Sequence, residues 1–325
     1  MENIGVILAA GKGTRMKSLV NSKAKVCFKI FDKAMIEYVY DALSQAKVNN
    51  IVTIVGHSSD EVIELLNTRC DFALQKEQKG TGHALMQAIP YLKKDTNTVI
   101  VCGDTPLLSA STIEKLIETH VKEENVATIL EAEVENPFGY GRLIKDKYGN
   151  LVKIVEEKDA NEKEKKIKFI NTGVYVIQTN FLIDYLKLLK PKNSQNEYYL
   201  TDIFKLLVDD SLKVRSCLLE DKVEFLGVND RVQLALATKY MQKRINEKHM
   251  LNGISIVDPD TTYIGSDVVI GNDTTIYPNT FLYGHSIVGT NCNIGPNSYI
   301  VDSIIDNDVS TKNSAIETQT LRKTN

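Results

Sequence analysis

The sequence lacks the features that mark several classes of protein. Its 325 residues carry a formal net charge of only −3, so we expect no general surface for nucleic acid, and any anion site must come from local clustering. None of the five cysteines forms a CxxC pair, and their number is odd. A disulfide framework or a zinc site is therefore not expected, and a reducing compartment is favoured.

Long apolar runs are absent as well. The chain opens with Met1-Glu2-Asn3 and has no basic N-terminal region, and its first apolar run, from Ile4 to Ala10, stops at a glycine. Such a run is too short for a signal peptide or a membrane-spanning helix. We therefore expect a cytoplasmic protein without membrane insertion.

In the first part of the chain, short apolar runs alternate with helical patterns. Three β-branched-rich runs are typical of buried strands: Ile4–Leu8, Ile51–Val55 and Val99–Cys102. Apolar residues recur at helical spacing from Met35 to Ala46, and Ser111 with Glu114 forms a capping box for another helix. This order predicts an α/β fold with a Rossmann-like, mostly parallel sheet, while residues 126–178 favour antiparallel strands.

A second periodicity follows a long helix predicted over residues 230–251, which Asn229 or Asp230 can cap and Gly253 can end. Aliphatic residues then recur every six positions at Ile264, Ile270, Ile276, Leu282, Val288, Ile294 and Ile300. This hexapeptide repeat predicts a short left-handed parallel β-helix. The phase slips after the seventh position, so two to three coils are expected, and residues 310–325 are expected to fray.

These patterns predict three parts: a first domain over residues 1–229, a linker helix over 230–252, and a truncated hexapeptide-repeat domain over 253–325. A solenoid of this length usually needs partners to cover it, so we expect a homotrimer formed through the β-helix.

A glycine-rich turn follows the first predicted strand, in the segment Leu8-Ala9-Ala10-Gly11-Lys12-Gly13-Thr14-Arg15-Met16. Its small residues let backbone N–H groups approach phosphate oxygens closely. The stretch from Asn3 to Phe31 has no acidic residue but contains Lys12, Arg15, Lys17, Lys23, Lys25 and Lys29. The turn matches neither common phosphate-binding motif. With its charge bias it indicates a nucleotide triphosphate site rather than a tight turn with solvated lysines.

Further motifs follow in order along the chain. They are Gln75-x-x-Gln78-x-Gly80-Thr81-Gly82-His83-Ala84, Gly103-Asp104-x-Pro106-Leu107, Gly139-Tyr140-Gly141-Arg142, Val155-Glu156-x-Lys158-Asp159-Ala160, Ile170-Asn171-Thr172-Gly173, Glu197-Tyr198-Tyr199-Leu200-Thr201-Asp202 and Gly227-Val228-Asn229. With the hexapeptide tail, this ordered set resembles the family of bacterial bifunctional N-acetylglucosamine-1-phosphate uridylyltransferases/glucosamine-1-phosphate acetyltransferases, over residues 3 to about 305.

The resemblance implies a Mg²⁺-dependent nucleotidyltransferase that joins UTP to N-acetylglucosamine 1-phosphate, releases pyrophosphate and supplies UDP-N-acetylglucosamine for the cell wall. It implies nucleotide contacts at Leu8, Ala9, Gly11, Gln75, Gly80 and Thr81. It implies sugar contacts at Gly141, Glu156 and Asn171, and a metal ligand at Asn229.

Chemical requirements point to three more residues. Two polyanions must meet, so catalysis rests on positioning and charge neutralisation. Arg15 offers a planar donor fork to the leaving phosphates, and Lys25 can neutralise the attacking phosphate and the α-phosphate, unless it is simply solvated. Asp104 follows a strand at the edge where α/β sheets bind ligands, and one carboxylate suits Mg²⁺. The alternative for Asp104 is a turn residue or helix cap before Pro106, and for Asn229 a helix cap.

The chain departs from the family pattern at three places. Ala24 stands where proline is usual before the lysine, Asp32-Lys33-Ala34 replaces Gly-Lys-Pro, and Cys102 replaces a usual tyrosine. None of these changes removes a charge that the chemistry needs.

Three rival functions remain to be weighed. One is a pyrophosphorylase for another nucleotide or sugar 1-phosphate. A second is an acetyltransferase, which the family builds on a longer solenoid than this sequence contains, so that activity is expected to be absent. A third is a non-catalytic nucleotide-sugar-binding subunit, and the presence of Arg15, Lys25, Asp104 and Asn229 argues against it.

Overall fold

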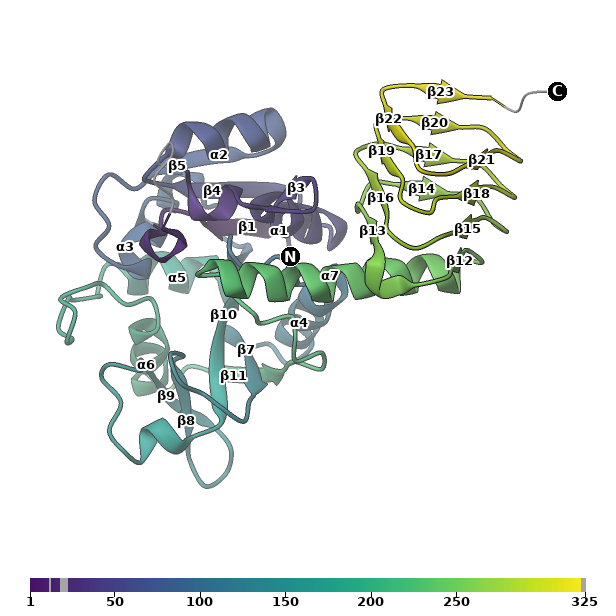
Figure 1. Ribbon diagram of the computed structural model, residues 1–325. Helices are drawn as coiled ribbons and strands as arrows, with labels where there is room; N and C mark the ends of the chain where they lie inside the picture. The colour runs from purple at the N-terminus through teal and green to yellow at the C-terminus, as the bar shows by residue number, and fades with distance from the viewer. Residues whose placement is uncertain (12, 18–22, 323–325) are drawn as a thin grey trace. The chain divides into compact units, whose positions relative to one another are not determined.

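The computed structural model describes residues 1–11, 13–17 and 23–322, so Lys12 of the glycine-rich turn lies outside the described residues. The chain divides into two compact units (Figure 1). The first contains Met1–Phe28 and Met35–Asp230, and the second contains Lys29–Ala34 and Arg231–Asn325. The short segment 29–34 thus groups with the second unit, although the sequence placed it in the first predicted domain.

In the described residues, a nine-stranded sheet forms the centre of the first unit, with main strand order β11-β7-β10-β6-β1-β4-β5. Its strands are β1 (Asn3–Leu8), β4 (Asn50–Val55), β5 (Asp71–Leu74), β6 (Asn97–Cys102), β7 (Ala127–Glu133), β8 (Arg142–Lys145), β9 (Leu151–Val155), β10 (Phe169–Gln178) and β11 (Val214–Leu218). The three predicted strands are β1, β4 and β6, which pair in parallel. The antiparallel part predicted for 126–178 is confirmed, because β10 runs antiparallel to β6, β7 and β8.

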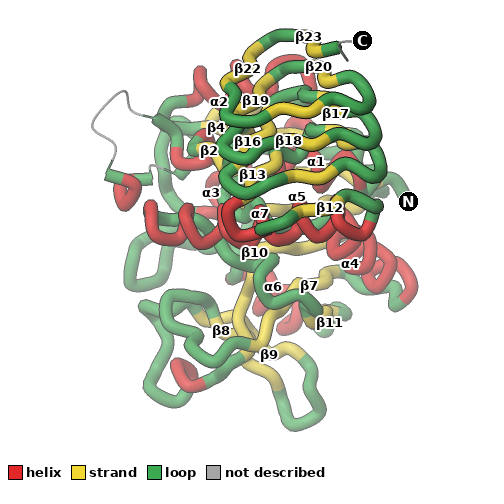
Figure 2. The backbone as a smooth tube through the Cα atoms, turned by 45° about the vertical axis from the view of Figure 1, so that its right-hand side comes forward, coloured by secondary structure: helices red, strands yellow, loops and turns green. Residues whose placement is uncertain are grey.

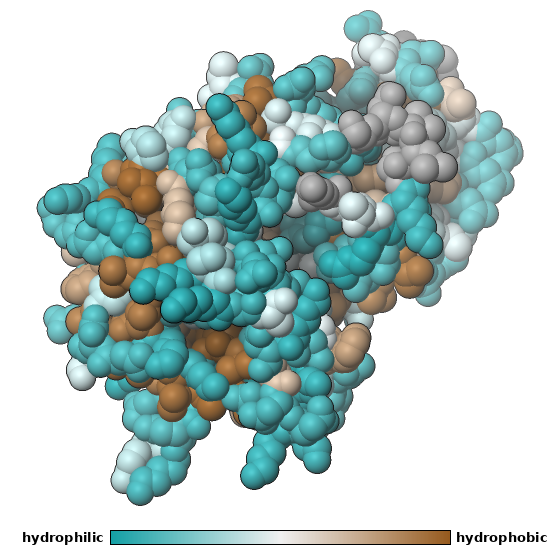
Figure 3. All heavy atoms as spheres, turned by 90° about the vertical axis from the view of Figure 1, so that its left-hand side faces the viewer, coloured by the Kyte–Doolittle hydropathy of each residue, from teal (hydrophilic) through white to brown (hydrophobic). Residues whose placement is uncertain are grey.

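Helices accompany the sheet and bury their apolar faces. They are α1 (Met35–Gln45), α2 (Ser59–Leu66), α3 (Thr81–Met86), α4 (Ala110–Lys122), α5 (Thr179–Leu186) and α6 (Asp202–Asp209). Strand β1 is buried along Ile4–Ile7, as a strand covered on both faces requires. The predicted α/β fold with a Rossmann-like sheet is therefore confirmed. The face of the molecule shown in Figure 3 is mostly hydrophilic, with separate apolar patches.

The capping box predicted at Ser111 is wrong by two positions. Ser109 is the residue in extended conformation before α4, and its hydroxyl accepts the N–H of Thr112 at 3.2 Å. The backbone N–H of Ser109 is itself held by the Glu224 carboxylate at 3.0 Å, which fixes where the helix begins.

The second unit starts with α7 (Arg231–Leu251), the predicted long helix, which ends at Gly253 in a left-handed conformation with φ of 87°. Three parallel sheets of four strands each then stack into the left-handed β-helix (Figure 2). The first sheet holds β12 (Ser255–Ile256), β15 (Thr275–Ile276), β18 (Asn293–Ile294) and β21 (Ser310–Thr311). The second holds β13 (Thr262–Ile264), β16 (Thr280–Tyr283), β19 (Tyr299–Val301) and β22 (Ala315–Glu317). The third holds β14 (Val269–Ile270), β17 (Ile287–Val288), β20 (Ile304–Ile305) and β23 (Thr320–Leu321).

All seven aliphatic repeat positions point inward and are at most 8% exposed. The expectations of two to three coils and of fraying after residue 310 are both wrong for the described residues, because β21, β22 and β23 form a fourth coil that pairs in register with the preceding one. The phase slip shortens the later coils, since Phe281 pairs with Tyr299 but Tyr299 pairs with Ala315. The turns absorb the missing residues, and the backbone ladder continues with Ile305 and Ile316 inside.

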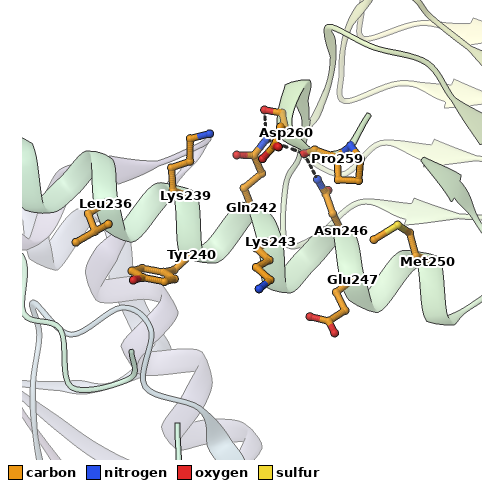
Figure 4. Close-up of a pocket in the computed structure, with 10 residues that line it drawn as sticks. All are labelled: Leu236, Lys239, Tyr240, Gln242, Lys243, Asn246, Glu247, Met250, Pro259 and Asp260. Atoms are coloured by element: carbon orange, nitrogen blue, oxygen red, sulfur yellow. Dashed lines mark hydrogen bonds between the residues drawn. The ribbon is translucent and has the colours of Figure 1, made fainter. Parts of the chain in front are cut away.

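Two side-chain amides of α7 fasten the helix to the start of the β-helix (Figure 4). The Gln242 Nε2 donates to the carbonyls of Pro259 and Asp260, both at 3.1 Å, and the Asn246 Nδ2 donates to the Pro259 carbonyl at 2.9 Å. Both amides also bond the Thr262 carbonyl. These bonds satisfy carbonyls at the open end of the solenoid, which would otherwise lack partners.

The segment 29–34 is a hairpin of β2 (Lys29–Ile30) and β3 (Lys33–Ala34) that docks on the β-helix. The Phe31 ring stacks on Tyr283 with centroids 6.1 Å apart. The Asp32 carboxylate accepts the Gly284 N–H at 2.5 Å, and Lys33 pairs with Asp267 at 3.1 Å. The hairpin tip is thus held by an aromatic, a hydrogen-bonded and an ionic contact.

Within the part of the chain that the structure describes, no helix is both long and apolar enough to cross a membrane.

Candidate active site

The glycine-rich turn and three other loops meet at one edge of the sheet of the first unit. Leu8 at the end of β1 pairs with Cys102 at the end of β6, so the chain leaves both strands at the same place. A cavity of about 290 Å³ opens there, lined by Leu8, Ala9, Ala10, Gly11, Lys25, Val26, Gln75, Gln78, Gly80, Thr81, Ala84, Cys102, Asp104 and Glu197. It brings together all six predicted nucleotide contacts with Lys25 and Asp104. This is the topological position where open α/β sheets bind ligands.

The approach of Lys25 to this loop depends on Gly13. That glycine has a left-handed φ of 61°, and a Cβ there would lie 2.6 Å from the Cβ of Lys25. Lys25 itself starts a 3-10 turn, η2 (Lys25–Cys27), whose Val26 and Cys27 are buried. The preceding Ala24 donates its N–H to a Glu61 carboxylate oxygen at 3.1 Å, a bond that the proline usual in the family could not make.

Four predicted residues form one polar cluster at the mouth of the phosphate loop. The Lys25 ammonium is paired with the Asp104 carboxylate and also donates to the Asn229 Oδ1 at 3.1 Å. The Arg15 guanidinium donates to the same Asn229 oxygen at 2.9 Å. Asn229 reaches this place because the N–H of Val228 bonds the Asp104 carbonyl at 2.8 Å. Two cations thus converge on two side-chain oxygens from distant parts of the sequence.

This cluster fits a Mg²⁺ site. The Asp104 carboxylate and the Asn229 amide oxygen face one shared position, which the Lys25 ammonium fills as a cation. The described residues contain no cluster of three or more His, Cys, Asp or Glu side chains suited to a metal. A single carboxylate agrees with Mg²⁺ chemistry, since this ion takes most ligands from water and substrate phosphates. The helix-cap alternative for Asp104 fails, because Ser109 caps α4, whereas the turn alternative is correct about its backbone, since Asp104 lies in the turn after β6.

Gln75, one of the predicted nucleotide contacts, lines the cavity and is only 3% exposed. Its Nε2 lies 3.2 Å from the Gly80 carbonyl and 3.0 Å from the His83 Nδ1. His83 is thus a partner that orients Gln75. Gly80 has φ of 103°, and a Cβ there would lie 2.6 Å from the Tyr198 carbonyl oxygen, so only glycine fits.

The segment Glu197–Asp202 forms hydrogen bonds with the loop that carries Gly80. Tyr198 donates its N–H to the Lys79 carbonyl and accepts the Gly82 N–H, both at 2.8 Å. The Thr81 hydroxyl accepts the Leu200 N–H at 3.1 Å. Two motifs that are far apart in the sequence therefore form one structural unit.

The three predicted sugar contacts lie together beside this cavity but do not line it. A Cβ on Gly141 would lie 3.3 Å from the Glu156 Oε2 and 3.5 Å from the Asn171 Cβ. The Asn171 N–H donates to the Gly141 carbonyl at 2.8 Å, and the Glu156 Oε1 accepts the Thr201 hydroxyl at 2.9 Å. Burial raises the pKa of Glu156, against the lowering effect of the Thr201 bond. An acceptor carboxylate is thus held close to a backbone turn.

Cys102 lies between the two groups of residues. Its Sγ approaches the Gly173 carbonyl at 3.8 Å, next to Asn171, and it also lines the nucleotide cavity. Burial raises the pKa of the Cys102 thiol to about 12, so it stays neutral at physiological pH.

Sequence reasoning did not assign roles to three residues of this region. These are Arg142, which is buried beside the Gly141 turn, Thr201, which orients Glu156, and Glu197 in the cavity lining. Their motifs were visible in the sequence, but the contacts that give them roles join residues far apart in the chain.

A larger cavity, of about 690 Å³, lies along α7 in the second unit (Figure 4). It is lined by Leu236, Lys239, Tyr240, Gln242, Lys243, Asn246, Glu247, Met250, Pro259 and Asp260. It holds neither a glycine-rich turn nor any of the predicted site residues, so size alone does not make it the candidate active site.

The amino-acid sequence matches two protein families, one in each part of the chain. The nucleotidyl transferase family matches residues 4–237, and the bacterial transferase hexapeptide family, with six repeats, matches residues 262–302. The bifunctional protein GlmU of Carboxydothermus hydrogenoformans is 49% identical over 303 residues, which are 93% of this chain and 67% of that protein. GlmU of Lactobacillus helveticus is 48% identical over 98% of this chain and 68% of its own length.

A solved structure of a glucose-1-phosphate thymidylyltransferase from Bacillus anthracis shares the fold. It superimposes with a TM-score of 0.60 over 73% of this chain and 94% of its own, at 23% sequence identity. At that identity the likeness shows only the fold, whereas the GlmU relatives match both units. The chain therefore belongs to the nucleotidyl transferase family and, within it, to the bifunctional GlmU proteins.

Proposed function

We propose that this protein transfers the uridylyl group of UTP to N-acetylglucosamine 1-phosphate and releases pyrophosphate. The observation that carries the proposal is the cluster of Lys25, Arg15, Asp104 and Asn229 beside the glycine-rich turn. Membership of the GlmU proteins supports the same reaction. The product, UDP-N-acetylglucosamine, would serve cell-wall synthesis in the cytoplasm.

The reaction is an in-line displacement at the α-phosphorus of UTP. An oxygen of the sugar phosphate forms the new P–O bond, and the bond to the β-phosphate breaks, with pyrophosphate leaving. This displacement needs no side-chain nucleophile. The protein must instead position two polyanions and offset their mutual repulsion. Lys25 would neutralise the attacking phosphate and the α-phosphate, and Arg15 would bind the leaving phosphates through its donor fork.

Asp104 and Asn229 would hold Mg²⁺ through their side-chain oxygens. When bound there, the ion supplies positive charge to the phosphates and lowers the cost of charge build-up. With those two oxygens on Mg²⁺, the Lys25 ammonium would be left to bind the substrate phosphates. The residues present fit this exchange of partners.

Recognition of the base and of the sugar would come from two separate sets of residues. Leu8, Ala9, Gly11, Gln75, Gly80 and Thr81 line the cavity and would contact the uridine part. Gly141, Glu156 and Asn171 offer a backbone turn, a carboxylate and an amide, which suit sugar hydroxyl and acetamido groups.

The test is pyrophosphate release from UTP, N-acetylglucosamine 1-phosphate and Mg²⁺. Asp104→Ala should abolish the release, whereas Asp209→Ala, an exposed aspartate on α6, should leave it unchanged. A preference for TTP, ATP or CTP in a nucleotide panel would move the proposal to another pyrophosphorylase. UTP binding without turnover of any sugar phosphate would favour the non-catalytic subunit.

Acetyl transfer is a separate question with its own test. The absence of acetyltransferase activity in this 325-residue chain stays a prediction. Its measurement is the release of free CoA from acetyl-CoA and glucosamine 1-phosphate. Release that depends on the protein would overturn that prediction without affecting the uridylyl transfer.

A further inference from the structure

Arg142 is a buried cation that the proposed reaction does not use. It opens β8 and is only 1% exposed, and a charge so deeply buried needs hydrogen-bond partners. Both terminal nitrogens of its guanidinium have partners, whereas its Nε has none within the described residues. Its guanidinium bonds the Tyr140 carbonyl, the Glu157 Oε2 at 2.5 Å and the Lys165 carbonyl at 3.5 Å. The first contact is to Tyr140, in the loop that carries Gly141, and the second is to the Glu157 carboxylate, which itself bonds this loop.

Glu157 also bonds the backbone of this loop. Its Oε2, the oxygen that pairs with Arg142, also accepts the Gly139 N–H at 3.1 Å. Strands β8 and β9 lie side by side (Figure 1). The ion pair follows from their register, because Arg142 pairs with Val155, which stands two residues before Glu157. The ion pair therefore holds both Gly139 and Tyr140, the residues just before Gly141.

The loop needs such support because its glycines are permissive. Gly139 has φ of 88° and open space around it, so the backbone there has many alternatives. Gly141, in contrast, stands close to the Glu156 Oε2 and accepts the Asn171 N–H. The distance between the Gly141 backbone and the Glu156 carboxylate defines the sugar subsite, and it depends on where the preceding two residues are held.

We propose that Arg142, acting with Glu157, is a positioning residue for the sugar 1-phosphate, an inference that rests on the proposed function. Its planar fork holds a carbonyl and a carboxylate at fixed angles, which a lysine ammonium cannot reproduce. Arg142 is not among the residues that line the nucleotide cavity, so it should affect the sugar substrate and not UTP. A purely structural ion pair would instead change stability and affect both substrates alike.

The experiment compares Arg142→Lys and Glu157→Gln with the unchanged protein in the full chain. Arg69→Lys is the matched control, because Arg69 also pairs with a carboxylate, Asp41 at 2.5 Å, but on the α1 side of the same unit. KM and kcat are measured separately for UTP and for N-acetylglucosamine 1-phosphate, together with the thermal midpoint of unfolding. Glu157 is partly exposed, so its variant tests the proposal even if Arg142→Lys does not fold.

We expect Arg142→Lys to raise the KM for the sugar phosphate about tenfold, equivalent to about 1.4 kcal/mol, and to leave the KM for UTP within about twofold. Glu157→Gln should shift the same constant in the same direction by less, and Arg69→Lys should shift neither. Equal changes for both substrates, or none, would overturn the positioning role. Inactivity of the unchanged protein toward every sugar phosphate would instead overturn the proposed function.

Discussion

At the residue scale, the cluster of Lys25, Arg15, Asp104 and Asn229 gathers local positive charge in a protein of negative net charge, as the proposed binding of two polyanions requires. Lys25 and Arg15 are held by Asp104 and Asn229 before any substrate arrives. The same oxygens would hold Mg²⁺, so the cations are already gathered at the site, and Lys25 would exchange these oxygens for substrate phosphates.

Replacing Lys25 by methionine tests this arrangement. Lys25→Met keeps much of the side-chain volume but removes the charge that faces the phosphates, so we expect kcat for pyrophosphate release to fall about 100-fold. Lys23→Met is the control, because Lys23 belongs to the same basic segment yet pairs with Glu61 at 3.4 Å. A loss below about threefold in Lys25→Met would exclude a charge role for this lysine.

His120 makes a second residue-scale prediction, about pH. Burial lowers the pKa of His120 to about 4, while its ring bonds Thr128 at 2.9 Å and Asn97 at 3.3 Å. The unfolded chain binds the proton near pH 6.5, so the neutral ring stabilises the fold above that pH and the contribution is lost as pH falls toward 4.

Between pH 7.5 and 5 we expect the unchanged protein to lose about 2 kcal/mol more unfolding free energy than His120→Gln. Urea unfolding at the two pH values provides the measurement. Equal losses in both proteins would show that other groups control the acid response.

At the scale of elements, the hairpin of β2 and β3 is the least expected feature. It interrupts the first unit in sequence but packs on the β-helix, with Asp32 accepting the Gly284 N–H. The second Asp32 oxygen, Oδ1, is buried without a hydrogen-bond partner in the described residues. The departure from Gly-Lys-Pro to Asp32-Lys33-Ala34 thus creates a contact that a glycine could not make.

Asp32→Ala should release the Gly284 amide, since a hydrogen bond to a charged acceptor contributes about 1.5–3 kcal/mol. We expect hydrogen exchange at Gly284 to become at least about tenfold faster. Asp32→Asn keeps an acceptor and should exchange nearly as slowly as the unchanged protein. Asp267→Ala, which removes only the more exposed pair with Lys33, should have a small effect. Identical exchange in all variants would contradict the role of Asp32.

At the scale of the whole molecule, the β-helix presents a stripe of exposed aliphatic side chains. Val269, Ile287 and Ile304 are 58%, 46% and 45% exposed and stand in register on neighbouring coils. Contiguous apolar surface of this kind commonly marks an interface, and we propose that it is covered in a homotrimer of this chain.

Ile287→Glu should therefore convert trimers to monomers, because three carboxylates would have to be buried in the interface. Asn293→Glu introduces the same charge on a different face and should leave the trimer intact. Light scattering after size exclusion gives the mass, and uridylyl transfer should persist in both variants. A monomeric unchanged protein would exclude the trimer, and an unchanged mass for Ile287→Glu would exclude this stripe as its interface.

The sequence by itself determined the α/β sheet, the long helix and the β-helix. Each depends on local periodicity, such as the six-residue spacing from Ile264 to Ile300, and such patterns need no knowledge of distant contacts. It also brought Lys25, Arg15 and Asp104 to attention through their chemistry and the remaining candidate site residues through the family resemblance, whereas the pairing that places β1 beside β6 came from the structure.

Only the tertiary structure decided the remaining features. Arg142 meets Glu157 because β8 and β9 reverse, Ser109 rather than Ser111 caps α4 because Glu224 holds its N–H, and the last coil persists because the backbone ladder tolerates a shorter turn. Each outcome depends on partners far away in the sequence. Since the positions of those partners are set by packing and not by local pattern, the periodicity of the sequence could not reveal them.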